Sequence, residues 1–248
     1  MKKELKEQFI ILWEKYFGDA GLPITFYYIE GDGGAERAET PKGQSCIICE
    51  LAKVINNGES VYYNKGNLAC GGARRYLGYD QKMRPGFEYF LSCGNAIMEG
   101  ERYIRTPEMV NELMAKLKPL HSEGKNIVFK RWDKLEESDN PEVVIFFASP
   151  DVLSGLFTLA NFDQTEPNGT IAPFGSGCSS IVYHPLLEGM SERQRAVIGM
   201  FDPSARKCVP ENILTFAVPK KRFEKMIGYM EESFLITKSW SIIRKRMR

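Results

Sequence analysis

Two short apolar segments constrain the fold most, because each has the composition of a buried β-strand. Residues 24–29 read ITFYYI and residues 143–148 read VVIFFA, both rich in β-branched and aromatic side chains. Ser149, Pro150 and Asp151 follow the second segment directly, and this order is typical of the first turn of a helix. We therefore expect strands that run straight into helices.

Further helix and strand signals are spread along the chain. Residues 2–17 have apolar side chains at helical spacing, and residues 106–108 read Thr-Pro-Glu, a second helix start. Apolar residues near 87–91 and 102–105 favour two additional strands. The chain is therefore predicted to be α+β, with mixed or antiparallel sheets and helices, in a single domain over residues 1–248.

The second half of the chain repeats the order of the first: strand, helix, turn, cysteine, strand, helix. We expect two pseudo-repeated lobes around a cleft, with internal repeat halves at 20–125 and 140–235. At one fixed offset the halves align three pairs of identical residues, Leu51 with Leu159, Ala52 with Ala160 and Cys70 with Cys178. The alternative is one α+β domain with a similar rhythm in both halves and no duplication.

Charge and hydropathy exclude two classes of partner. The chain has 33 basic and 32 acidic residues, so no overall field attracts nucleic acid. No apolar run approaches the roughly 20 residues that span a membrane. The charged N-terminus does not look like an export signal, so we expect a cytoplasmic protein whose six cysteines are thiols or ligands rather than disulfides.

Cysteines form the first candidate site. Cys46 and Cys49 make a C-x-x-C motif, and Cys70 and Cys93 follow. Residues three apart project to the same side of a helix start, so such thiolates can share zinc or an iron–sulfur cluster. We predict metal ligands at Cys46, Cys49 and Cys70. A thioredoxin-like redox motif and a set of buried, inert thiols are the alternatives.

A glycine pair forms the second candidate site. Gly71, Gly72 and Arg74 follow Cys70, and glycines before a helix let backbone N–H groups approach an anion while an arginine pairs with it. These three residues are the predicted binding site for a small anionic ligand or cofactor. The alternative is an ordinary turn, because the P-loop ending and the third glycine of a dinucleotide motif are both missing.

A third candidate is Cys178, within the segment Gly175–Ser180, which could be a catalytic nucleophile. Such a role requires a base, and the chain has only His121 and His184. His184 lies six residues after Cys178.

Several short segments resemble an uncharacterised prokaryotic family, domain of unknown function 169, also called ArCR. The resemblance covers residues 10–235, and Cys46 and Cys93 lie outside its pattern. The segments that carry it are Cys49–Ala52, Cys70–Ala73, Tyr76–Gly78, Val143–Ala148 with Pro150, Cys178–Ser180, Asp202–Arg206 and Phe216–Pro219. The family implies no activity, and its occurrence in anaerobes favours metal chemistry.

Three functions follow from these features. The first is a binding or redox-associated protein in which Cys49, Cys70 and Cys178 face a shared cleft and hold a metal or an iron–sulfur cluster. The second is an enzyme that acts on a small anionic metabolite, with Cys178 as nucleophile. The third is an interaction module with inert thiols. Neither the substrate nor the oligomeric state follows from the sequence.

Overall fold

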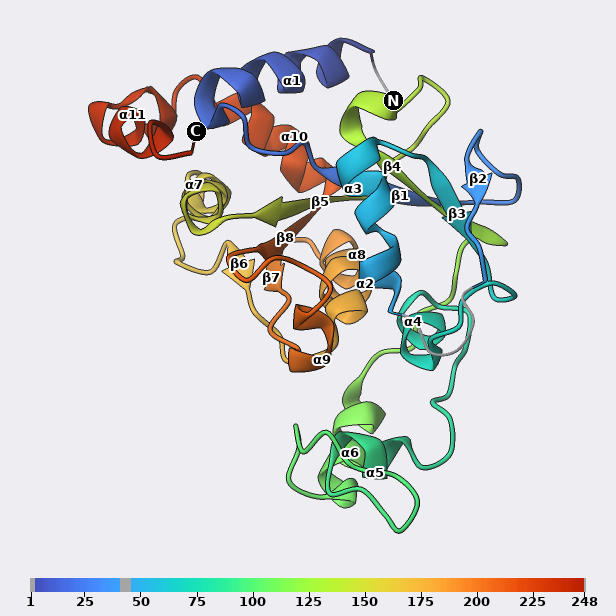
Figure 1. The fold of residues 1–248 in the computed structure, drawn as a ribbon. Coiled ribbons are helices and arrows are strands. Elements are labelled where there is room, and N and C mark those ends of the chain that lie inside the picture. Colours follow the sequence, from blue (N-terminus) through green and yellow to red (C-terminus); the bar gives the residue numbers. More distant parts are fainter. Residues whose placement is uncertain (1–2, 41–45, 248) are drawn as a thin grey trace.

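One mixed sheet of eight strands runs through the protein, which we describe from a computed structural model (Figure 1). The structure describes residues 3–40 and 46–247. The strand order is β2-β3-β4-β1-β5-β8-β7-β6. The strands are β1 (Ile24–Ile29), β2 (Glu36–Arg37), β3 (Val61–Tyr63), β4 (Asn126–Arg131), β5 (Val143–Ala148), β6 (Thr170–Ile171), β7 (Ala196–Gly199) and β8 (Leu214–Pro219).

Helices cover both faces of this sheet, which contains parallel and antiparallel pairs. The predicted α+β class with a mixed sheet is confirmed. A π-helix, Ser179–Tyr183, leads directly into α8. The α-helices are α1 (Lys3–Phe17), α2 (Ile47–Glu50), α3 (Ala52–Asn57), α4 (Gly71–Tyr76), α5 (Phe87–Leu91), α6 (Pro107–Lys116), α7 (Pro150–Asn161), α8 (His184–Gly189), α9 (Pro203–Arg206), α10 (Lys220–Tyr229) and α11 (Lys238–Arg244). No described helix has the length and apolar character needed to cross a membrane.

Two of the strand predictions are wrong. Residues 87–91 form helix α5, which begins after Gly86 in the left-handed conformation, with φ of 80°. Residues 102–105 are irregular, and Arg102 has a φ of 56°, which interrupts an extended backbone. Aromatic residues in so short a segment fit a helix turn as well as a strand, so periodicity alone does not separate the two.

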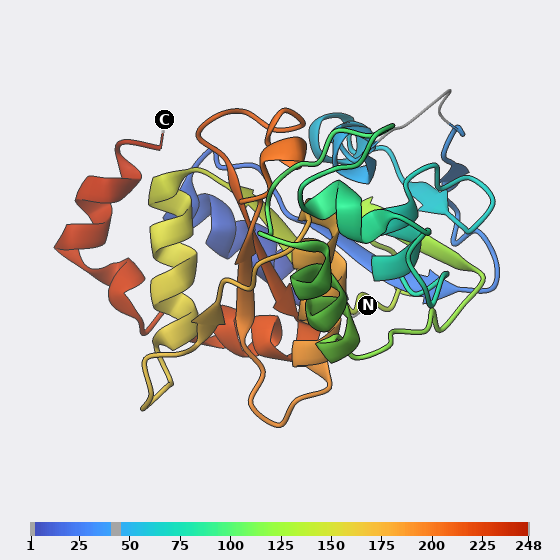
Figure 2. The ribbon, with the colours of Figure 1, turned by 90° about the horizontal axis from the view of Figure 1, so that it is seen from below.

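Strict alternation along β5 divides the core into two layers. Val143 and Ile145 point into the cluster beneath α2, α3, α4 and α8. Val144 and Phe146 point to the opposite face, into the cluster formed with α1, α7 and α10. Figure 1 shows α1 and α10 above the sheet and α8 below it, and Figure 2 shows the molecule from below.

The two halves of the chain supply four strands each, in the same order. From the central β1–β5 pair outwards, the first half runs β1-β4-β3-β2 and the second runs β5-β8-β7-β6. In both units the outermost pair is parallel, and the pairs inside it are antiparallel. This repetition supports the predicted duplication, which stays a prediction together with the cleft between lobes. The predicted first half, 20–125, stops short of β4, which completes its four strands.

A buried ion pair stabilises the first unit. Lys130 on β4 and Asp139 are both almost fully buried, and the Lys130 Nζ lies 3.1 and 3.0 Å from the two carboxylate oxygens. The Tyr27 hydroxyl donates to the same carboxylate, and burial is the main cause that raises the pKa of Tyr27 well above its ordinary range. Removing one partner of such a pair leaves an uncompensated charge.

We expect Lys130→Met to lower the free energy of unfolding by about 3–5 kcal/mol, because Asp139 then stays buried without its cation. Lys125→Met, at an exposed position just before β4, is the matched control and should change it by less than about 0.5 kcal/mol. Urea denaturation measures both variants. Equal stability of the two variants would show that the pair does not stabilise the fold.

Candidate functional site

Two cysteines occupy equivalent positions in the two halves. Cys46 precedes α2, between β2 and β3, and Cys178 precedes the π-helix, between β6 and β7. Their local sequences share the pattern Pro-x-Gly-x-x-Cys, which begins at residues 41 and 173. The earlier residues of the first copy, 41–45, lie outside the described part of the chain.

A second equivalent pair consists of Cys70 and Asp202, the N-cap residues of α4 and α9, which follow β3 and β7. The Cys70 sulfur accepts a hydrogen bond from the Ala73 N–H at 3.5 Å, and an Asp202 carboxylate oxygen accepts one from the Ser204 N–H at 2.9 Å. Both segments continue with x-x-Ala-Arg, ending at residues 74 and 206.

These pairs correct the alignment predicted from sequence. Residues 46 and 178, and residues 70 and 202, both differ by 132 in number, whereas the predicted offset placed Cys70 opposite Cys178. In the sheet, Cys70 follows β3 and Cys178 precedes β7, so these two cysteines are not equivalent. Cys70 and Cys178 nevertheless pack on the same core cluster, and the charge of Cys70 acts on Cys178.

We call Cys46, Cys70, Cys178 and Asp202 the thiol cluster, because the charges of Cys70 and Asp202 act on both Cys46 and Cys178. Burial raises the pKa of Cys178 far above its ordinary value, and Cys70, Cys46 and Asp202 raise it further. Burial also raises the pKa of Cys46, as do Cys70 and Asp202 to a smaller extent. The Ser176 hydroxyl, 3.2 Å from the Cys178 sulfur, opposes the shift. Cys46 and Cys178 are therefore protonated at neutral pH.

The backbone around the cluster is tightly packed. A Cβ atom on Gly177 would lie 3.1 Å from side chains of Ile48 and Ala205, so a glycine lets the chain before Cys178 approach α2 and α9 closely. Met200, two residues before Asp202, has a φ of 69° although it is fully buried and not a glycine. Strained backbone of this kind is concentrated at functional sites.

The predicted absence of disulfides is wrong. Cys49 and Cys208 are bonded, with sulfurs 2.07 Å apart and Cα atoms 4.6 Å apart. They are separated by 159 residues in sequence, but α2 and the segment after α9 pack on the same core cluster and bring them together. Cys49 is exposed and Cys208 half-buried. The sulfur of Cys49, a predicted metal ligand, is therefore bonded to Cys208 and does not bind a metal in the disulfide-bonded protein.

The cation of the predicted anion site, Arg74, already forms an ion pair. The Arg74 Nε lies 3.4 Å from Asp80, which also pairs with Lys65. A Cβ atom on Gly71 would meet nothing within 4 Å, so no close approach requires that glycine. Binding by Gly71, Gly72 and Arg74 stays a prediction. The buried guanidinium without a carboxylate belongs instead to the next residue, Arg75, which the sequence analysis missed.

The structure does not pair Cys178, the predicted nucleophile, with a histidine base. Between Cys178 and His184, the structure places no hydrogen bond, and burial lowers the pKa of His184. A buried, protonated thiol is a weak nucleophile, so the catalytic role of Cys178 stays a prediction that burial weighs against. Cys93 is exposed after α5 and is not among the charges that shift the pKa of Cys46 or Cys178.

Within residues 3–40 and 46–247, no group of three or more histidine, cysteine, aspartate or glutamate side chains is arranged to hold a single metal ion. The shared site predicted for Cys46, Cys49 and Cys70 is therefore not formed in this disulfide-bonded state.

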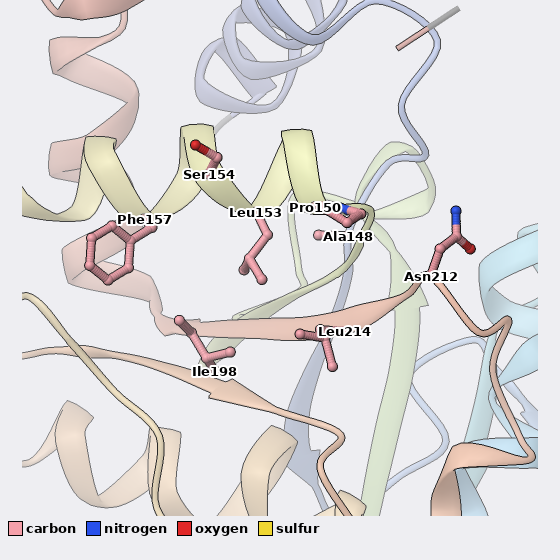
Figure 3. Close-up of a pocket in the computed structure, with 8 residues that line it drawn as sticks. All are labelled: Ala148, Pro150, Leu153, Ser154, Phe157, Ile198, Asn212 and Leu214. Atoms are coloured by element: carbon pink, nitrogen blue, oxygen red, sulfur yellow. The ribbon is translucent and has the colours of Figure 1, made fainter. Parts of the chain in front are cut away.

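A pocket of about 310 Å³ lies elsewhere, between α7 and strands β5, β7 and β8 (Figure 3). Its walls are mostly apolar, and neither a cysteine nor a titratable side chain contributes to them. The lining residues are Ala148, Pro150, Leu153, Ser154, Phe157, Ile198, Asn212 and Leu214. This pocket is separate from the thiol cluster.

Thiol titration tests the cysteine assignment. Unreduced protein, denatured with a chelator present, should give four thiols, and reduced protein six. Cys208→Ser should give five in both states, whereas the control Cys93→Ser should give three and then five. Reduction of the wild type should lower the free energy of unfolding by roughly 2–5 kcal/mol, because the bond closes a long loop. Six thiols in unreduced protein would refute the assignment.

The comparisons with known proteins identify a family and nothing finer. Neither the curated proteins nor the solved structures give a match. Residues 23–228, most of the chain and all eight strands, match the family described as uncharacterised ArCR, domain of unknown function 169. The chain belongs to this family.

Proposed function

We propose that the thiol cluster holds an iron–sulfur cluster, with Cys46, Cys70 and Cys178 as thiolate ligands and Asp202 as the fourth. The observation that carries this proposal is that Cys46, Cys70 and Asp202, each at the start of a helix, act electrostatically on buried Cys178, and that the four residues form two equivalent pairs. Thiolates select zinc and iron–sulfur clusters over harder cations. Asp202 brings a carboxylate to the same set.

We infer an iron–sulfur cluster rather than a single zinc ion at these residues. A single zinc ion needs all four ligands within about 2.3 Å of one point. The described residues offer no such group, although the charges of Cys46, Cys70 and Cys178 act on one another. Ligands of an iron–sulfur cluster bind different irons, so they lie farther apart than ligands of one ion.

The local structure suits thiolates once a metal is present. Cys70 already accepts a backbone N–H at the start of α4, and hydrogen bonds to sulfur stabilise bound thiolates. Metal binding must displace the protons of Cys46 and Cys178, whose pKa values burial raises. Loading should therefore strengthen with increasing pH.

Metal analysis of anaerobically purified protein tests the proposal. Wild type, as isolated or after reconstitution with iron and sulfide, should carry stoichiometric iron and acid-labile sulfide. Cys46→Ser, Cys70→Ser and Cys178→Ser should each lose most of the iron, because each removes a ligand. Cys93→Ser, an exposed thiol outside the cluster, is the control and should load like wild type.

Two results would contradict the proposal. One is a wild type that takes up no iron after reconstitution, and the other is full loading of Cys70→Ser. If the wild type instead carries stoichiometric zinc without iron, and the same variants lose it, then these residues bind zinc and not an iron–sulfur cluster.

The exposed Cys49–Cys208 bond favours a second candidate function, thiol–disulfide exchange with a partner dithiol. A partner thiolate would attack the Cys49 sulfur and release Cys208 as a thiolate. The second partner thiol would then displace Cys49, so that the protein gains two electrons and two protons while the partner becomes a disulfide. Cys49 is the more exposed of the two residues.

Native-state reduction tests this second candidate. Folded protein with a dithiol such as dithiothreitol should release two thiols much faster than it unfolds, and Cys93→Ser should do so at the same rate. Reduction that proceeds only at the rate of unfolding would make the bond purely structural.

A further inference from the structure

Arg75 differs from the other buried basic residues in having no counter-ion. Its side chain is 5% exposed, and its Nη1 atom is buried without a hydrogen-bond partner. Buried Lys130 pairs with Asp139, and buried Arg222 pairs with Asp163 at 2.8 Å. The Nε atoms of Arg74 and Arg222 also lack a hydrogen bond, but each of these arginines forms an ion pair with a carboxylate. Among the described residues, Arg75 forms no ion pair at all.

This arrangement is costly unless an anion is present. A guanidinium does not give up its proton in a protein, so Arg75 cannot become neutral as a buried lysine can. An uncompensated buried charge destabilises a fold by several kcal/mol. Folds keep such a charge where a ligand uses it, at the expense of stability.

The surroundings of Arg75 have the character of a binding site. Burial raises the pKa of Tyr76 and of Tyr183, and the Arg75 charge opposes both shifts, which places the guanidinium near the two hydroxyls. The two rings meet edge to face with centroids 5.6 Å apart. The Tyr183 hydroxyl donates to the Lys118 carbonyl at 2.7 Å. Tyr183 ends the π-helix against which α4 packs, and π-helices are frequent at functional sites.

We propose that Arg75 anchors a binding site for a small oxyanion, a carboxylate or a phosphate group, beside Tyr76 and Tyr183. The planar guanidinium presents paired N–H donors that match two oxygens of such a group. This site differs from the one predicted at Gly71, Gly72 and Arg74, because Arg74 already forms an ion pair with Asp80 whereas Arg75 forms none with a described residue. It does not depend on a metal, so it stands or fails independently of the proposed iron–sulfur cluster.

Thermal unfolding of metal-free protein with the disulfide intact tests the site. Melting temperatures are compared in chloride, phosphate and acetate at equal ionic strength and pH. At least one of the two oxyanions should raise the melting temperature of wild type saturably, since it binds only the folded state. The anion that acts identifies the class, phosphate or carboxylate. Arg74→Gln is the matched control and should respond like wild type.

Arg75→Met should abolish the response. In chloride alone it should also melt higher than wild type, because an apolar side chain of similar length replaces an uncompensated charge. A purely structural arginine would give the opposite result, a lower melting temperature. The proposal is overturned if neither anion stabilises wild type, if Arg75→Met responds equally, or if Arg75→Met is less stable than wild type in chloride.

Discussion

The antiparallel pairing of β1 with β5 is the contact on which the rest of the structure depends. It aligns Ile24 with Ile145 and Phe26 with Val143, and it joins two four-stranded units of the same order into one sheet. The aligned residues point into the same core cluster, under the helices of both units. In both units the helices that start at the thiol cluster follow corresponding strands: α2 and the π-helix follow β2 and β6, and α4 and α9 follow β3 and β7.

Around this junction the structure has several features that are rare or energetically unfavourable in proteins. Three thiols and a carboxylate converge, Met200 takes a left-handed backbone, a π-helix replaces an α-helix, and Arg75 is buried without a counter-ion. Elsewhere buried charges are paired, as in the Arg222 ion pair that holds the pKa of Asp163 well below its usual range. Features of this kind are concentrated at functional sites, where function is retained at a cost in stability. Their coincidence in one region is the reason for placing the site there.

The sequence predicted the parts of the fold that depend on local pattern. The strands at 24–29 and 143–148 and the helix starts at Thr106 and Ser149 follow from side-chain periodicity and capping, and the structure confirms them. Long-range contacts were out of reach: the Cys49–Cys208 bond joins segments with no local signal for each other. Arg75 looked like Arg74 in sequence, because only the fold decides which arginine meets Asp80. Asp202 had a usable signal, the shared x-x-Ala-Arg continuation at an offset of 132 residues.

The central claim is that both halves of the chain contribute ligands to one metal centre at their junction. Anomalous diffraction at the iron edge, from crystals of anaerobically reconstituted protein, tests it most directly. The claim predicts one compact iron peak whose nearest atoms are the sulfurs of Cys46, Cys70 and Cys178, at about 2.3 Å, and an oxygen of Asp202. An iron peak held by only one half of the chain, or no peak within bonding distance of these sulfurs, would contradict it.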